Sequence, residues 1–445
     1  MRNLCWPIQC LISSILCCLC SLAFAAEDEK FTPLFNGQDL SGWKIVNVAP
    51  ETFTVQDDIL VSTGKPTGTI RTERMYENFI LELEWRHMKA GGNAGVFIWG
   101  DPLTAVGSPF SRGIEVQVLD GRETANYTSH GDVFAIWGAT MKPDRPHPGG
   151  WARCLPSEKR CKPSPEWNHY RIECNNGSLK LQVNGKEVSG GSECSPRKGY
   201  ICLESEGSEC HFRNIQIREL PSTNPPKEAI ANEAEGFVPL LFDAELSQWK
   251  QIAGNEGHWK MNDWQLLYDG KSEAKEPLEK HLWTKQDYGN FVLVVDWRLP
   301  NKPQKKEWPL VQPNGEEVLG DDGKPKLVTV DDAGNSGILL RGYEHAQANI
   351  CCRPVGSGEI TEFRTNKKYS AEVRAGVTPK KRADKPNGQW NRFVITMQGD
   401  RVTIVLNGER IIDRAQLPDV PAKGPIGLQH HEEPVQFGNI FIREL

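Results

Sequence analysis

The chain has 445 residues, which is more than one ordinary hydrophobic core can organise, so two domains are expected. Its 41 glycines and 30 prolines indicate many turns and therefore β structure. The formal net charge of −6, with no concentrated basic segment to hold a phosphate backbone, excludes nucleic acid as an expected partner.

Residues 1–25 are predicted to be a secretory signal peptide. Arg2 precedes an apolar stretch that ends in Ala23-Phe24-Ala25, a pattern typical of a signal-peptide cleavage site. The apolar stretch is short for a membrane span, and an uncleaved anchor helix is the alternative. We therefore expect a secreted or periplasmic protein with no membrane span after cleavage.

Eight cysteines follow the predicted signal peptide, and an even number in an exported chain favours disulfides. Cys154 and Cys161 could close one loop. The adjacent Cys351 and Cys352 could form a strained vicinal disulfide, or each could pair elsewhere. No cysteine or histidine spacing predicts a zinc site, and no cofactor is expected, although calcium stays open without a motif for it.

Two copies of one sequence make up the rest of the chain, in residues 26–220 and 237–445. NFILELEWR recurs as NFVLVVDWR, GGNAGVFIWG as AGNSGILLRG, and FRNIQIREL as FGNIFIREL. A Pro-rich and then Ala/Glu-rich linker, residues 221–236, joins them. The second copy also carries an insert, residues 301–332, which is predicted to form a polar hairpin.

Short strands with alternating polarity dominate each copy. Apolar residues at every second position, such as Leu81, Leu83 and Trp85, alternate with polar ones, and long helical periodicity is absent. The repeated ending predicts a closing strand with Ile215 and Ile217 on its core side. This pattern predicts an all-β fold in which each copy is an antiparallel two-sheet sandwich.

The segment RGIEVQVLDG, residues 112–121, holds the densest polar pattern of the first copy. Glu115 and Gln117 share one strand face, and Asp120 could join them through a β-bulge. Asn93 lies in the turn-like GGNAG, and Arg86 ends a strand. A solvated polar strand face is an equally consistent interpretation.

The strand positions of Glu115 and Gln117 both carry amides in the second copy. Gln347 and Asn349 align with Glu115 and Gln117, and Glu359 aligns with Asp132. The other polar candidates of the second copy are Arg298, Asn335, Arg341 (aligned with Trp99), Gln429 and His431.

The order of the motifs along the chain resembles the 3-keto-disaccharide hydrolase family. These motifs are, in sequence, LFNGQDLSGW, NFILELEWR, GGNAG, IEVQVLD, EWN, VNG and FRNIQIREL. The resemblance implies concanavalin A-like jelly rolls and cleavage of glycosides that are oxidised to a ketone at sugar C3. Such a ketone acidifies the neighbouring C2–H, so one base and a donor to the enolate oxygen suffice.

With this resemblance, the expected bases are Glu115 or Asp132 in the first copy and Glu359 in the second. The expected substrate-binding residues are Arg86, Asn93, Trp99, Gln117, Asp120, Arg298, Asn335, Arg341, Gln347, Asn349, Gln429 and His431. The product could be that of a hydrolase or of a lyase.

Two other functions use the same residues without catalysis. A lectin-like, carbohydrate-binding protein of the cell envelope would use the polar sheet with Trp99 and Trp137 as stacking platforms. A structural or adhesive envelope component is the third alternative, because fold alone does not fix function.

Overall fold

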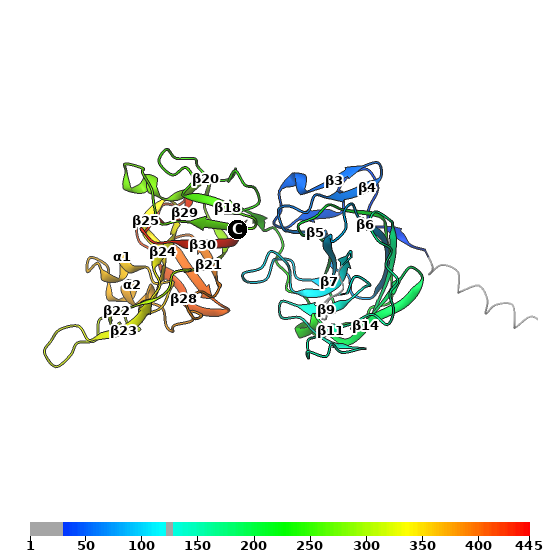
Figure 1. The fold of residues 1–445 in the computed structure, drawn as a ribbon. Coiled ribbons are helices and arrows are strands. Elements are labelled where there is room, and N and C mark those ends of the chain that lie inside the picture. Colours follow the sequence, from blue (N-terminus) through cyan, green and yellow to red (C-terminus); the bar gives the residue numbers. More distant parts are fainter. Residues whose placement is uncertain (1–29, 122–127) are drawn as a thin grey trace, which may run out of the picture.

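The computed structural model describes residues 30–121 and 128–445, so the predicted signal peptide, residues 1–25, lies outside the described residues. Two antiparallel β-sandwiches lie side by side, the first copy in blue to green and the second in green to red (Figure 1). The predicted fold class, two tandem concanavalin A-like jelly rolls, is confirmed. Within the described part of the chain, no helix is long and apolar enough to cross a membrane.

The first copy consists of two sheets, which we call A1 and B1. In spatial order, A1 holds β10 (Thr140–Pro143), β14 (Lys186–Ser195), β13 (Ser178–Val183), β12 (Asn168–Asn175), β6 (Phe79–His87), β16 (Cys210–Glu219), β4 (Ile59–Ser62) and β3 (Phe53–Gln56), with β1 (Thr32–Pro33) also on β16. B1 holds β11 (Arg153–Cys154), β9 (Val133–Ile136), β8 (Gly113–Leu119), β7 (Asn93–Gly100), β15 (Tyr200–Ser205), β5 (Gly68–Thr72) and β2 (Trp43–Ile45).

The second copy repeats this arrangement in sheets A2 and B2. A2 holds β18 (Trp259–Asn262), β19 (Gln265–Tyr268), β30 (Val435–Glu444), β21 (Phe291–Arg298), β26 (Asn391–Gln398), β27 (Arg401–Leu406) and β28 (Glu409–Gln416), with β17 (Val238–Pro239) also on β30. B2 holds β20 (Leu282–Tyr288), β29 (Gly424–Leu428), β24 (Asn335–Leu340) and β25 (Tyr343–Cys351).

Short elements complete the chain. The insert in the second copy forms the hairpin of β22 (Gln304–Pro309) and β23 (Leu327–Asp332). The helices are α1 (Thr361–Thr365) and α2 (Ala371–Gly376), and the 3-10 turns are η1 (Pro50–Thr52), η2 (Lys227–Ala229) and η3 (Pro277–Lys280). The predicted linker, residues 221–236, contains η2 and runs from β16 to β17.

The core of each copy lies between its two sheets and follows the period-two pattern. Leu81 and Leu83 of β6 and Ile172 of β12 are fully buried, and Leu81 lies opposite Ile172 across the ladder. Ile215 and Ile217 of the repeated ending are buried in the same core. Alternation therefore places the intervening residues of each strand on the outer face of its sheet, where the polar groups gather.

The prediction of disulfides is wrong for the described residues, in which all eight cysteines are free thiols. Cys174 and Cys210 occupy core positions on different strands and pack as small apolar side chains. Burial raises the pKa of the Cys161 and Cys194 thiols to about 12, so they stay protonated at neutral pH.

Candidate functional site

The outer face of sheet B1 carries a cluster of acidic and amide side chains on three neighbouring strands. Glu115 and Gln117 of β8 point to this face because Ile114, Val116 and Val118 take the core side. Gly95 of β7 lies opposite Gln117, and Glu204 comes from β15 on the other side of β7. Both carboxyl side chains are buried, with Glu115 only 6% exposed and Glu204 only 1%.

A glycine allows two carboxylates to converge over the middle strand. A Cβ atom on Gly95 would lie 2.6 Å from Glu204 Oε2 and 2.9 Å from Glu115 Oε1, closer than such atoms approach without displacement. The absence of a side chain on β7 therefore creates the space in which Glu115 and Glu204 meet.

The environment of these carboxyls favours their protonated forms. Burial, followed by the charges of Glu206 and Asp132, raises the pKa of Glu115 well above its usual range, against an opposing effect of Arg153. Burial, the charges of Glu115 and Glu206 and a hydrogen bond with Glu206 raise the pKa of Glu204 in the same way. Raised pKa values of this kind are typical of carboxyls that take part in general acid–base catalysis.

Amide groups orient the neighbouring Glu206. Gln117 Nε2 donates to Asn93 Oδ1 at 2.8 Å and to the Ala94 carbonyl at 3.1 Å, so both its amide hydrogens are used. Asn93 Nδ2 in turn donates to Glu206 Oε2 at 2.5 Å. Gln117 therefore fixes Asn93, and the half-buried Asn93 connects this amide pair to the acidic cluster.

Asp132 is held in an ion pair and is therefore not available as a base. Its carboxylate is fully buried and forms an ion pair at 2.5 Å with Arg153, which is itself almost fully buried. The Thr128 hydroxyl also donates to it. These contacts hold β9 and β11 together beside the site, so Asp132 acts on Glu115 only through its charge.

Three other predicted residues of the first copy lie away from Glu115. Arg86 belongs to the outer face of A1, where its guanidinium stacks over Trp167 at 4.5 Å, because β6 is not a strand of B1. The register of β7 and β8 contains no bulge, so Asp120 faces away and accepts from the Ser164 amide. Trp99 has a left-handed backbone (φ 57°) that turns its indole into the core, where Nε1 donates to the Glu77 carbonyl at 2.8 Å.

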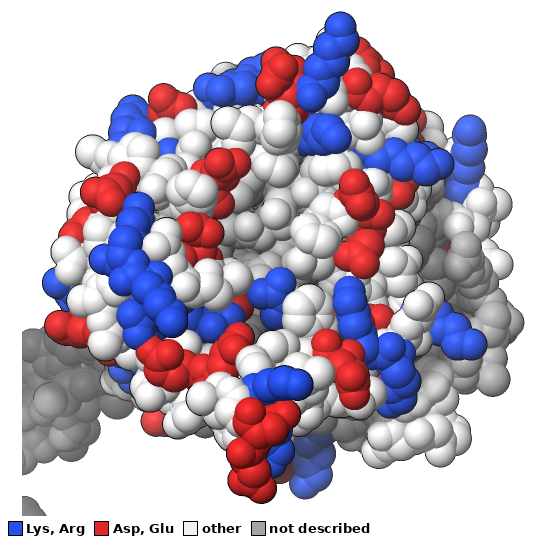
Figure 2. Space-filling view, turned by 90° about the vertical axis from the view of Figure 1, so that its left-hand side faces the viewer, with Lys and Arg blue, Asp and Glu red and all other residues white. Residues whose placement is uncertain are grey.

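The second copy has an open cavity of about 450 Å³ on the corresponding face of B2. Five predicted residues meet in it: Asn335, Gln347, Asn349, Gln429 and His431. The remaining lining residues are His281, Leu339, Glu344, His345, Arg353, Thr361 and Glu362. Figure 2 views the second copy from the side of β25 and α1 in Figure 1, and charges of both signs surround a hollow in that face.

The two copies place different chemistry on one backbone arrangement. Gln347 Nε2 donates to Gln429 Oε1 at 2.6 Å. This pair lies over Gly337, because a Cβ atom added to Gly337 would lie 2.1 Å from Gln347 Nε2. Asn335 Nδ2 lies 3.1 Å from His431 Nε2. The carboxyl pair of the first copy thus corresponds to an amide pair in the second, whose groups can donate and accept hydrogen bonds but transfer no proton at neutral pH.

The remaining candidates of the second copy have structural contacts. Glu359 is fully buried and paired with Arg364 and Arg353, with the Thr361 hydroxyl donating to it at 2.8 Å. It is therefore the counterpart of Asp132 in position and in ion pairing, and it is not an open base.

Both predicted arginines of the second copy also point away from the cavity. Arg341 has a left-handed backbone (φ 54°), and its guanidinium donates to the carbonyls of Gly289, Gly399 and Pro421. Arg298 stacks over Trp390 at 4.7 Å on the outer face of A2.

Sequence reasoning missed Glu204 and Glu206 as functional candidates. Their signal was present, because they align with Gln429 and His431 and alternate with the buried Ile201 and Leu203. Arg353, Thr361 and Glu362 follow β25 in a segment with no periodic pattern, so only the folded chain shows that they line the cavity. Among the described residues, no group of three or more His, Cys, Asp or Glu is arranged to hold a metal ion.

Two stretches of the chain, residues 30–218 and 236–443, match the model of the 3-keto-alpha-glucoside-1,2-lyase-like domain. No curated protein matches the chain.

Two solved structures of proteins from Parabacteroides distasonis ATCC 8503, provisionally described as glycosyl hydrolases, are similar to one copy. The first is 23% identical, covering 43% of this chain and 95% of that chain, with a TM-score of 0.35. The second is 26% identical, covering 43% of this chain and 100% of that chain, with a TM-score of 0.32. The carbohydrate-binding module CBM66 from Bacillus subtilis is 12% identical, covering 40% of this chain and 96% of that chain, with a TM-score of 0.30.

Proposed function

The chain belongs to the 3-keto-alpha-glucoside-1,2-lyase-like domain family, and we propose that its first copy cleaves 3-keto-glycosides by elimination while its second copy binds saccharide. The difference between the copies carries this proposal. A buried carboxyl pair converges over Gly95, and a hydrogen-bonded amide pair occupies the same place over Gly337.

The proposed reaction needs one base and one acid. The base removes the proton on C2, which the C3 ketone has made acidic, and the electron pair forms an enolate. The enolate then expels the C1 substituent, so that the C1–O bond breaks, a C1=C2 double bond forms and the leaving oxygen takes a proton. No oxidant is consumed, and later addition of water across C1=C2 gives the products of hydrolysis.

Glu115 and Glu204 are the proposed acid–base pair. Burial and the charges of neighbouring carboxylates raise both pKa values, which suits one carboxyl to protonate the leaving oxygen and the other to accept the C2 proton. Asn93, held by Gln117, is the proposed donor to the substrate oxygen. Asp132 is excluded from this role because Arg153 neutralises it within the fold.

The second copy is proposed to be a saccharide-binding site. Its open cavity presents amides, histidines and an arginine, which can donate to and accept from sugar hydroxyls. The lectin-like alternative is thereby retained for this copy alone. Export is part of the same proposal and rests on the signal-like pattern of residues 1–25.

Glucose release from 3-keto-trehalose or 3-keto-maltose tests the catalytic part. Glu115→Gln and Glu204→Gln should each lower kcat by about a hundredfold or more, since each removes one proton-transfer group. Gln347→Ala, at the position of Glu115 in the second copy, should leave kcat unchanged. A Glu115→Gln enzyme as fast as the wild type would refute the assignment.

A glycan-binding measurement tests the second copy separately. Binding should persist in Glu115→Gln and weaken about tenfold in Asn335→Ala, which removes a polar group from the cavity. Equal glycan binding by Glu115→Gln and Asn335→Ala would contradict the proposal that the second copy contains the saccharide-binding site.

A further inference from the structure

The connection between β7 and β8, residues 101–112, contacts both copies. The Gly107 amide donates to Asp296 Oδ2 of A2 at 2.8 Å. Asn439 Nδ2 donates to the carbonyls of Ala105 at 3.0 Å and Ser108 at 2.8 Å. One turn of the first copy is thus bound through its backbone by two side chains of the second copy.

The groups that receive this turn are buried and fixed. Asp296 is fully buried and forms an ion pair with Arg392 at 2.6 Å, and its Oδ2 lies 2.7 Å from Asn439 Nδ2, which shares its two hydrogens between this oxygen and the two carbonyls. Gly107 has φ +69°, and an added Cβ would lie 2.4 Å from the Trp390 ring. The contact therefore has the close fit of a built interface, with a glycine where no side chain is tolerated.

The other side of the same connection packs on β7, next to the proposed catalytic site. Phe110 packs on Phe97 with ring centroids 5.8 Å apart, in an apolar cluster separate from the main core. Phe97 lies directly opposite Glu115 in the β7–β8 ladder, so both side chains project from the same face of B1. A shift of the connection would move Phe110 relative to Phe97 and Glu115.

We propose that Asp296 and Asn439 of the second copy are positioning residues for the catalytic site of the first copy. They hold residues 105–108, and these in turn hold Phe110 against Phe97 beside Glu115. The catalytic consequence rests on the proposed function, whereas the ordering of residues 105–110 by the second copy does not.

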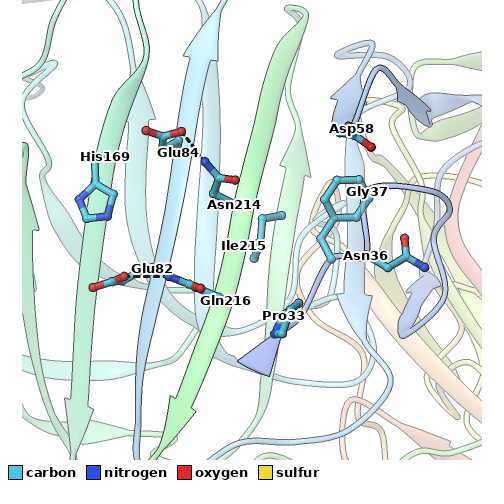
Figure 3. A pocket seen from close by; sticks show the side chains of 11 residues that line it. Pro33, Asn36, Gly37, Asp58, Glu82, Glu84, His169, Asn214, Ile215 and Gln216 are labelled. Atoms are coloured by element: carbon cyan, nitrogen blue, oxygen red, sulfur yellow. Dashed lines mark hydrogen bonds between the residues drawn. The ribbon is translucent and has the colours of Figure 1, made fainter. Parts of the chain in front are cut away.

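The repeated sequence supplies a matched control. Asn214 and Glu84 of the first copy stand at the positions of Asn439 and Asp296, and Asn214 Nδ2 donates to Glu84 Oε2 at 2.8 Å. Figure 3 shows this pair at the edge of a cavity of about 540 Å³ on the outer face of A1. The same asparagine–carboxylate pair thus occurs once bound to a turn and once beside an open cavity.

Hydrogen exchange in the full chain tests the ordering. Asn439→Ala should speed amide exchange in residues 105–110 by about tenfold or more, because it removes two of their hydrogen bonds, and Asn214→Ala should not. Gly107→Ala perturbs the turn itself and should also speed exchange in residues 105–110. It serves as the test if Asn439→Ala fails to fold. Unchanged exchange in both Asn439→Ala and Gly107→Ala would overturn the proposal.

Kinetics then separate positioning from general destabilisation. Asn439→Ala should raise KM for a 3-keto-disaccharide at least about threefold, because displaced Phe110 and Phe97 would disturb the surroundings of Glu115, with a smaller change in kcat. A fall in kcat at constant KM would contradict positioning. If the wild type releases no product, the proposed function fails, and the exchange measurement still decides whether the second copy orders the turn.

Discussion

A single methyl group should separate the roles of the two copies. Gly95→Ala places a Cβ atom 2.6 Å from Glu204 Oε2 and 2.9 Å from Glu115 Oε1. An ordinary contact of a Cβ atom is 3.4–4 Å, so both carboxylates must move by several tenths of an ångström. Gly337→Ala is the matched change in the second copy, where the obstructing atom is Gln347 Nε2 at 2.1 Å.

The cost to folding should be modest and the cost to catalysis large. Inserting a methyl group into a packed region costs about 1–3 kcal/mol, and the lower end applies because ends of side chains, not backbone, obstruct the Cβ. For a domain of this size each kcal/mol lowers Tm by about 2–4 °C. Displacement of catalytic groups by a fraction of an ångström to about 1 Å costs up to about a hundredfold in rate.

Thermal unfolding and glucose release from 3-keto-maltose measure the two effects in parallel. We expect Gly95→Ala and Gly337→Ala to lose similar amounts of stability. We expect kcat/KM to fall at least about tenfold only in Gly95→Ala. Equal activity losses in the two variants, or a loss confined to Gly337→Ala, would refute the assignment of catalysis to the first copy.

Three further variants test the electrostatics and the placement of the site. The pKa of Glu204 is raised on folding, so its stabilising contribution is present below its unfolded pKa and is lost as pH rises through the folded pKa. Glu204→Gln should therefore raise Tm relative to wild type at pH 8 and not at pH 4, and an equal Tm difference at both pH values would contradict the raised pKa. Asp132→Asn removes the buried partner of Arg153 and should cost about 3–5 kcal/mol in denaturant unfolding, whereas a solvated Asp132 would predict almost no loss. Arg86→Ala should keep kcat/KM within about twofold of the wild-type value, because the Arg86 side chain lies on sheet A1. A large loss of kcat/KM would show that Arg86 takes part in the catalytic site.

Local patterns were sufficient to predict the fold. Alternation along NFILELEWR and the repeated FRNIQIREL ending predicted strands with Leu81, Leu83, Ile215 and Ile217 inside, and all four are buried. The same period-two rule put Glu115 and Gln117 on one face, which is where the structure places them. These features depend only on neighbours along one strand, which is why a sequence reveals them.

The predicted residues that the structure places away from Glu115 depend on contacts that no local pattern contains. Arg86 follows a strand pattern like that of Glu115, but the assignment of its strand to sheet A1 is a property of the whole sandwich. Trp99 and Arg341 take left-handed backbones at the end of equivalent strands, which turns both side chains inward. Asp132 was expected as a base from the family resemblance. Its ion pair with Arg153, which joins two short strands, gives no signal in the sequence.

The fate of the C2 hydrogen tests the central claim most directly. Proton NMR of a 3-keto-glycoside incubated with the wild-type enzyme in D₂O should show loss of the C2–H signal as the aglycone is released, with neither event in Glu115→Gln. Aglycone release from a sugar that keeps its C2 proton would show direct displacement at C1 and would contradict the account.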